Sequence, residues 1–148
     1  MIDPSTQLEA FIDKFDDGNQ ALIRAVRAAL RRRLPTANEL VYDNYNFFVI
    51  GYSPTERPSD CIVSIAASAK GASLSFYRGN EVADPEGLLL GAGNQNRFIR
   101  LQAAADIVKP GTDALIGRAV ALGPPLPPPG SGGKLIIRSI SAKQRPRR

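Results

Sequence analysis

The stretch GPPLPPPGSGG, residues 123–133, constrains the fold more than any other part of the chain. Proline fixes φ and has no backbone N–H, so residues 124–129 cannot form a helix or a central strand. They are expected to be extended polyproline II, a stiff spacer of about 19 Å, and the Gly/Ser residues after them predict a flexible join. We therefore predict a single domain over residues 1–123, a linker over 124–133, and a β-prone segment with a basic tail over 134–148.

The predicted domain has the pattern of an α+β protein. Apolar residues up to Arg33 recur at helical spacing, which predicts two N-terminal helices. From Glu39 onward β-branched and aromatic residues predict strands, including a hairpin around Lys70–Gly71 with one buried face and one face lined with hydroxyls. A C-terminal helix is expected over residues 112–122. The predicted fold is an antiparallel sheet of about five strands packed by two N-terminal helices and a C-terminal helix.

The stretch GAGNQNRFIR, residues 91–100, has the glycines and arginines of a nucleotide-binding loop. However, no Lys followed by Ser or Thr comes after Gly93, and Asn96 stands where the dinucleotide fingerprint has its third glycine, so a glycine-rich turn into a strand fits better. A small anion held by this turn remains a candidate, through Asn94 and Arg97. In a regular strand Arg97 and Arg100 point to opposite faces, and we favour Arg97 because it is nearer the turn.

The most unusual polar cluster is YDNYN, which consists of Tyr42, Asp43, Asn44, Tyr45 and Asn46. Aromatic rings with convergent hydrogen-bonding groups commonly line small-ligand pockets, whereas a hydrogen-bonded hairpin turn would explain the same residues. Combined with Arg97, the first interpretation predicts a non-enzymatic binding domain for a small anionic or polar ligand or a partner peptide.

The composition argues against catalysis and against a resident cofactor. The chain has no histidine, and its one cysteine, Cys61, lies in the apolar run CIVSIA, where we expect a buried and unreactive thiol. A zinc or haem site would lack histidine and cysteine ligands. The alternative is an iron site with oxygen ligands. The candidate iron face on the first helix consists of Glu9, Asp13, Asp16 and Asp17, and a solvated helix face explains the same acids.

Charge is unevenly distributed along the chain. Residues 1–113 contain 12 Lys and Arg against 14 Asp and Glu, whereas the last 35 residues contain seven cations and no acid. Contacts of this tail with nucleic acid or an acidic protein are expected to be electrostatic, and a solubilising tail is the alternative. The candidate contact residues are Lys143, Arg145, Arg147 and Arg148. The segment before them, KLIIRSIS, favours a sheet edge in its own chain or, through residues 134–141, in a homodimer.

Two features bear on localisation. No window approaches the roughly 18 apolar residues that a membrane-spanning helix needs. The start MIDPSTQLEA lacks the basic residues and apolar run of a secretory signal. We expect a cytoplasmic protein without membrane contact.

The order of its motifs resembles that of the YdhG-like family, a group of small domains of unknown function. The residues that carry the resemblance are LPTANELVYDNYN, SLSFYRGNEVADPEGLLLGAGNQNRFIRL and DALIGRAVAL, within about residues 20–122. One bacterial branch of that family is described as a frataxin-like iron chaperone. The resemblance implies an antiparallel sheet with N-terminal helices on one face, offers intracellular iron handling as an alternative function, and implies no known reaction.

Overall fold

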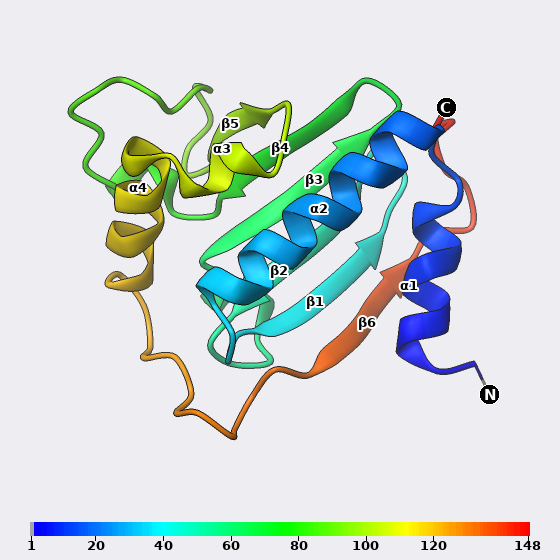
Figure 1. The fold of residues 1–148 in the computed structure, drawn as a ribbon, viewed down its shortest axis with the longest axis horizontal. Helices are drawn as coiled ribbons and strands as arrows, with labels where there is room; N and C mark the ends of the chain where they lie inside the picture. The colour runs from blue at the N-terminus through cyan, green and yellow to red at the C-terminus, as the bar shows by residue number, and fades with distance from the viewer. Residues whose placement is uncertain (1) are drawn as a thin grey trace.

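The computed structural model describes residues 2–148, which form an α+β domain around one six-stranded mixed sheet of order β5-β4-β3-β2-β1-β6 (Figure 1). The strands are β1 (Asn38–Asp43), β2 (Phe48–Ser53), β3 (Val63–Ser68), β4 (Gly71–Phe76), β5 (Arg97–Leu101) and β6 (Leu135–Ile140). The helices are α1 (Pro4–Ile12), α2 (Asp17–Arg33), α3 (Ala105–Val108) and α4 (Pro110–Val120), with short 3-10 turns at Pro58–Asp60 and Gly79–Glu81. The predicted α+β class is confirmed. Among these residues no helix is both long and apolar enough to cross a bilayer.

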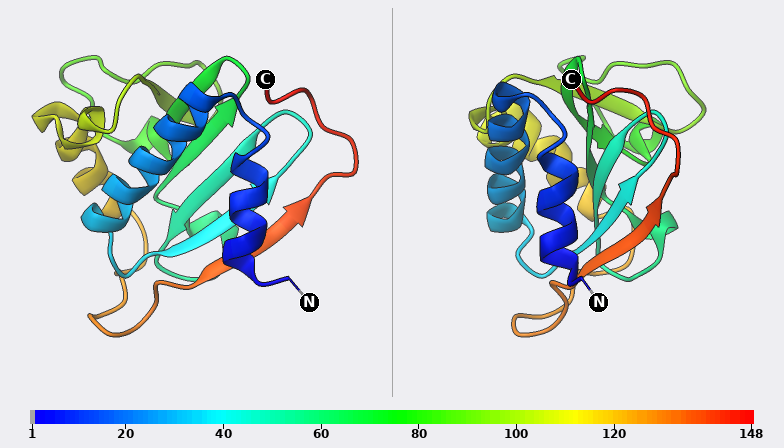
Figure 2. Two further views of the ribbon diagram at one scale, coloured as in Figure 1. Left: turned by 45° about the vertical axis from the view of Figure 1, so that its right-hand side comes forward. Right: turned by 90° about the vertical axis from the view of Figure 1, so that its right-hand side faces the viewer.

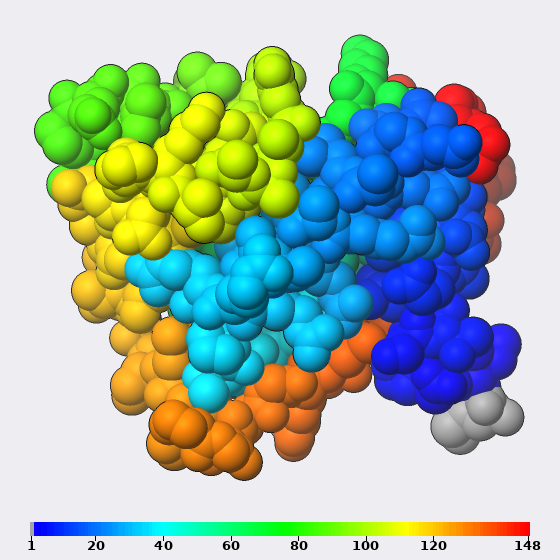
Figure 3. Space-filling view, in the orientation of Figure 1, coloured from blue at the N-terminus to red at the C-terminus, as the bar shows by residue number. Residues whose placement is uncertain are grey.

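Helices α1 and α2 cover one face of the sheet (Figure 2). An aspartate caps each of them: Asp3 accepts a hydrogen bond from the backbone N–H of Thr6, and Asp16 accepts one from that of Asn19. The apolar side of α2, which includes Ile23, Val26 and Leu30, is fully buried. The space-filling view shows α2 across the middle of this face (Figure 3). Burial of that apolar side, more than helix propensity, therefore fixes where α2 lies.

The predicted hairpin is present as β3 and β4, with its two-residue loop one position earlier than the expected Lys70–Gly71. Ser68 pairs with Gly71, so Ala69 and Lys70 form the two-residue loop, and Gly71 takes a φ of +133°, which glycine tolerates best. Along β4 the apolar residues are buried and the serines half-buried. The predicted hydroxyl-lined face is therefore present.

Strand β6 adds an edge strand to the predicted five-stranded sheet, which agrees with the first of the two placements expected for KLIIRSIS, an edge in its own chain. The five strands β1 to β5 pair antiparallel as expected, but residues 135–140 add a sixth strand that runs parallel to β1. The linker passes from α4 to the far edge of the sheet and arrives beside the start of β1, where the Gly133 N–H donates to the Thr36 carbonyl and the Lys134 N–H to Asn38 Oδ1. Because β6 enters at the end where β1 begins, it must run in the same direction. The fold thus uses residues on both sides of the predicted linker.

Candidate functional site

The structure does not bring the YDNYN cluster and Arg97 into one pocket. Across the sheet, Arg97 of β5 lies level with Phe76, Val63, Tyr52 and finally Glu39, at the start of β1. The YDNYN cluster begins at the other end of β1, four strands away from β5. The pocket expected between these residues is therefore absent, because strand register places them at opposite ends of the sheet as well as on different strands.

Arg97 is occupied by its own loop. Its Nη1 donates to the Gly93 carbonyl at 2.6 Å and to the Asn96 carbonyl at 2.9 Å. Its side chain also packs on Gly79, where an added Cβ would lie 2.5 Å from the Arg97 Cβ. Asn94 is exposed at the tip of the same loop. The guanidinium of Arg97 thus stabilises the loop and is a poor candidate for holding an anion.

The YDNYN cluster forms a tight turn that contacts the last residues of the chain. The Asn44 N–H donates to the Phe47 carbonyl, which closes the turn between β1 and β2. Asp43 is fully buried and accepts from Lys14 Nζ at 2.7 Å and from Arg147 Nη2 at 2.9 Å. Tyr45 and Asn46 are exposed, and Tyr42 is half-buried with its phenol pKa raised by burial. Of the two interpretations, the structure shows the hairpin turn.

Two of the four predicted tail cations are bound within the chain. Arg147 is 4% exposed and donates to Asp43 and to the Asn44 carbonyl. Arg148 donates to the carbonyls of residues 13–15, at the C-terminal end of α1, where cations interact favourably with the helix dipole. The end of the chain accordingly lies beside the start of α2 (Figure 3). Lys143 and Arg145 are exposed, and the Arg145 guanidinium lies 5.6 Å from the centre of the Tyr45 ring.

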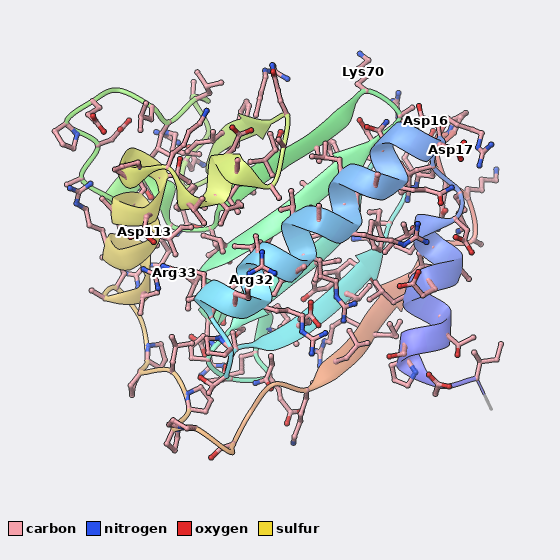
Figure 4. The ribbon with its side chains drawn as sticks, viewed as in Figure 1. Asp16, Asp17, Arg32, Arg33, Lys70 and Asp113 are labelled. Atoms are coloured by element: carbon pink, nitrogen blue, oxygen red, sulfur yellow. The ribbon has the colours of Figure 1, made fainter. Side chains whose placement is uncertain are left out.

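The acids of the candidate iron face are engaged separately. Arg24 Nη2 lies 2.9 Å from both Glu9 Oε2 and Asp13 Oδ1, and the hydrogen bond to Glu9 raises the pKa of Arg24. Asp16 caps α2 and Asp17 lies in its first turn, as Figure 4 shows. Within residues 2–148 no three His, Cys, Asp or Glu side chains converge on a point that could hold a metal ion. The spacing predicted a shared helix side, but α1 ends at Ile12 and the Arg24 guanidinium pairs with both Glu9 and Asp13.

A buried polar network that the sequence interpretation missed lies beneath α2. Glu39 is 5% exposed and accepts two hydrogen bonds of 2.9 Å from Arg27 Nε and Nη2 and one of 2.8 Å from the Tyr52 hydroxyl. Burial and the nearby Glu39 charge raise the pKa of Tyr52 well above its usual value. The available signal was that Glu39 alternates in phase with the apolar Val41, which predicts a carboxylate on the buried face of a strand.

Cys61 is placed as predicted, 8% exposed, and burial raises its pKa to about 11. Since the thiolate is the reactive form, alkylation by iodoacetamide at pH 8 should be about 100-fold slower in the folded protein than in denaturant. The rate is followed by mass spectrometry of the intact chain. Equal rates in both conditions would contradict the buried position.

A groove of about 490 Å³ lies along the free edge of β5, against the start of α4. One wall is the loop from Asp84 to Leu90. Asp84 shapes this loop by accepting the N–H groups of Leu88 and Leu89, and Leu90 bridges to Phe98 of β5. Leu88 and Ile99 supply apolar surface to the groove.

The opposite wall is formed by α3 and the first turn of α4. Asp106 accepts the N–H groups of Gln102 and Ala103 and forms an ion pair of 2.9 Å with Lys109, and these contacts lower its pKa. In the described part of the chain the N-cap residue of α4, Lys109, makes no side-chain capping hydrogen bond, and Thr112 in the first turn is 5% exposed and lines the groove. This helix is joined to the end of α2 by an ion pair of 2.7 Å between Arg33 and Asp113 (Figure 4). This wall of the groove is therefore in contact with α2.

Two charged side chains in the groove, Arg100 and Glu86, form no ion pair among residues 2–148. The Arg100 guanidinium lies 5.6 Å from the centre of the Phe98 ring and is exposed. The Glu86 carboxylate lies against Gly111, where an added Cβ would be 2.7 Å from Oε2. The sequence interpretation preferred Arg97 to Arg100 because Arg97 is nearer the turn, but the guanidinium of Arg97 is engaged by the carbonyls of that turn.

Comparison of the chain with protein-family models, with curated proteins and with solved structures finds no match. The resemblance to the YdhG-like family therefore stays a hypothesis, and a functional assignment has to come from the geometry of the groove.

Proposed function

We propose that the protein is a non-enzymatic binding domain that holds a small ligand with an acidic group in the groove beside Arg100. The observation that carries the proposal is an unpaired guanidinium in a groove of about 490 Å³, a volume within the usual range of ligand sites. Guanidinium groups bind carboxylates and phosphates through paired, charge-assisted hydrogen bonds.

The backbone of β5 adds a second donor at the same place. Phe98 uses its N–H and C=O to bridge outward to Leu90, and in an antiparallel strand these groups of residue 100 point to the same side as those of residue 98. No strand of residues 2–148 covers the edge of β5 at Arg100. An acidic group there would meet both the main-chain N–H and the guanidinium, while Leu88 and Ile99 would contact an apolar part of the ligand.

The test is thermal unfolding of the full chain with a panel of carboxylates, phosphates, nucleotides, amino acids and dipeptides. A ligand at a hundred times its dissociation constant stabilises by about 2.7 kcal/mol, which corresponds to a rise in Tm of roughly 5–10 °C for a domain of this size. Replacing Arg100 with glutamine should then weaken binding of the hit about tenfold or more, because a hydrogen bond to a charged group is lost.

The matched control is Arg138→Gln, which removes an exposed arginine from β6 on the opposite edge of the sheet. It should leave the dissociation constant unchanged, as measured by calorimetry. A panel without any stabilising compound, or equal losses in Arg100→Gln and Arg138→Gln, would rule out the proposed function.

A further inference from the structure

We infer that the ligand of this groove is a zwitterion of the amino-acid or short-peptide type, with its carboxylate at Arg100 and its ammonium group at Glu86. The inference rests on the proposed function and adds the chemical class of the ligand. It comes from the charged side chains that line the groove. These side chains comprise equal numbers of cations and anions, but only one cation and one anion form an ion pair.

Four charged side chains line the groove: Glu86, Arg100, Asp106 and Lys109. Asp106 and Lys109 form an ion pair of 2.9 Å, and Asp106 is also held by two backbone N–H groups. One cation and one anion therefore remain for a ligand. Arg100 and Glu86 do not pair with each other across the groove, so each is available to a group of opposite charge.

A ligand with only a negative charge would fit this arrangement poorly. It would gain the attraction of Arg100 and at the same time approach the Glu86 carboxylate, and like charges at close range in a partly enclosed site disfavour binding. A ligand that also carries an ammonium group would instead form a second ion pair, with Glu86. The net charge of the four lining groups is zero, which matches a ligand of zero net charge.

Glu86 lies close to the start of α4. Its carboxylate lies over Gly111 in the first turn of α4, where the positive end of the helix dipole favours an anion. A side chain at position 111 would collide with Glu86 Oε2 at 2.7 Å and with Leu88 Cδ1 at 2.8 Å, so glycine makes room for the acid. Gly87, with a φ of +67°, turns the loop directly after it.

The experiment compares Glu86→Gln with the unaltered protein, using the twenty amino acids and their dipeptides with leucine as probes. The best binder is then tested beside its N-acetyl derivative, which lacks the ammonium group, and its amide, which lacks the carboxylate. Glu86→Gln should weaken binding of the zwitterion about tenfold or more, because a charge-assisted hydrogen bond is lost, and should not weaken binding of the N-acetyl derivative. Glu86 is exposed, so the unliganded variant should unfold at an unchanged Tm.

A second variant, Gly111→Ala, moves the Glu86 carboxylate without removing it and should also weaken binding of the zwitterion. The inference is overturned if Glu86→Gln binds the best probe equally well or more tightly, or if a simple anion binds and no amino acid or dipeptide does. Both of these results leave the proposed function standing, since Arg100 would still hold an acidic group. If no anion and no zwitterion binds the unaltered protein, both this inference and the proposed function are ruled out.

Discussion

Replacing Asp43 with alanine is expected to lower the free energy of unfolding by about 3–5 kcal/mol, because removal of one partner of a buried ion pair leaves the other charge uncompensated. Asp43 is fully buried and accepts from Arg147, whose side chain is only 3% exposed, and from Lys14. The measurement is equilibrium unfolding in urea. The dependence of the unfolding free energy on urea concentration is compared between variants, to confirm that unfolding exposes the same amount of surface.

The comparison with Arg147→Met separates this effect from simple loss of packing. Two buried nitrogens of Arg147, Nε and Nη1, have no hydrogen-bond partner among residues 2–148, so the burial of this side chain is already unfavourable in part. When it is replaced by methionine, Asp43 keeps Lys14, and we expect a loss of only about 1–2 kcal/mol. If Arg147→Met destabilises the protein as much as Asp43→Ala, the unpaired charge is not the cause.

The second large effect is expected at the Glu39 network. Glu39→Ala should cost about 3 kcal/mol or more, because it leaves the half-buried Arg27 guanidinium and the buried Tyr52 hydroxyl without their acceptor. Arg31→Gln is the matched control. Arg31 lies 4.0 Å from the same carboxylate with its side chain 59% exposed, and its replacement should change stability by less than about 0.5 kcal/mol.

An apolar replacement of the whole network tests the reason for that loss. The triple variant Arg27→Leu, Glu39→Leu, Tyr52→Phe removes both charges and the hydroxyl together, and such exchanges are often neutral or stabilising by about 1–4 kcal/mol. Chemical unfolding should therefore show the triple variant to be more stable than Glu39→Ala alone. A triple variant as unstable as the single one would show that shape, and not an uncompensated charge, governs this site.

Local patterns were sufficient for much of the fold. Alternation of Ser73 and Ser75 with Leu74 and Phe76 predicted the β4 face correctly, because side chains of a strand alternate between faces. Strand β6 was harder to place, since proline and glycine show where local elements stop and carry no information on where the chain goes next. Its parallel partner, β1, lies about a hundred residues earlier.

The candidate site was less predictable than the fold, for a related reason. Arg97 and Arg100 have the same chemistry and lie three positions apart, and they differ in their contacts: the Arg97 guanidinium is held by carbonyls of its own loop, whereas that of Arg100 lies beside the Phe98 ring. Asp43 was recognised as unusual, but its partner Arg147 is 104 residues away in the sequence. Composition and spacing identify the charged groups. Whether each group has a partner, and which one, depends on tertiary packing.

The position of β6 also has a consequence for synthesis on the ribosome. Strand β1 is synthesised about a hundred residues before its neighbour Ile140, and at about 5–20 residues per second the interval is roughly 5–20 s. During that time the outer edge of β1 has no neighbour and Asp43 has only Lys14 to compensate its charge. An open strand edge is a template for pairing with other chains. A protein truncated within the proline-rich segment would lack β6 and keep the edge of β1 open. We expect such a fragment to aggregate.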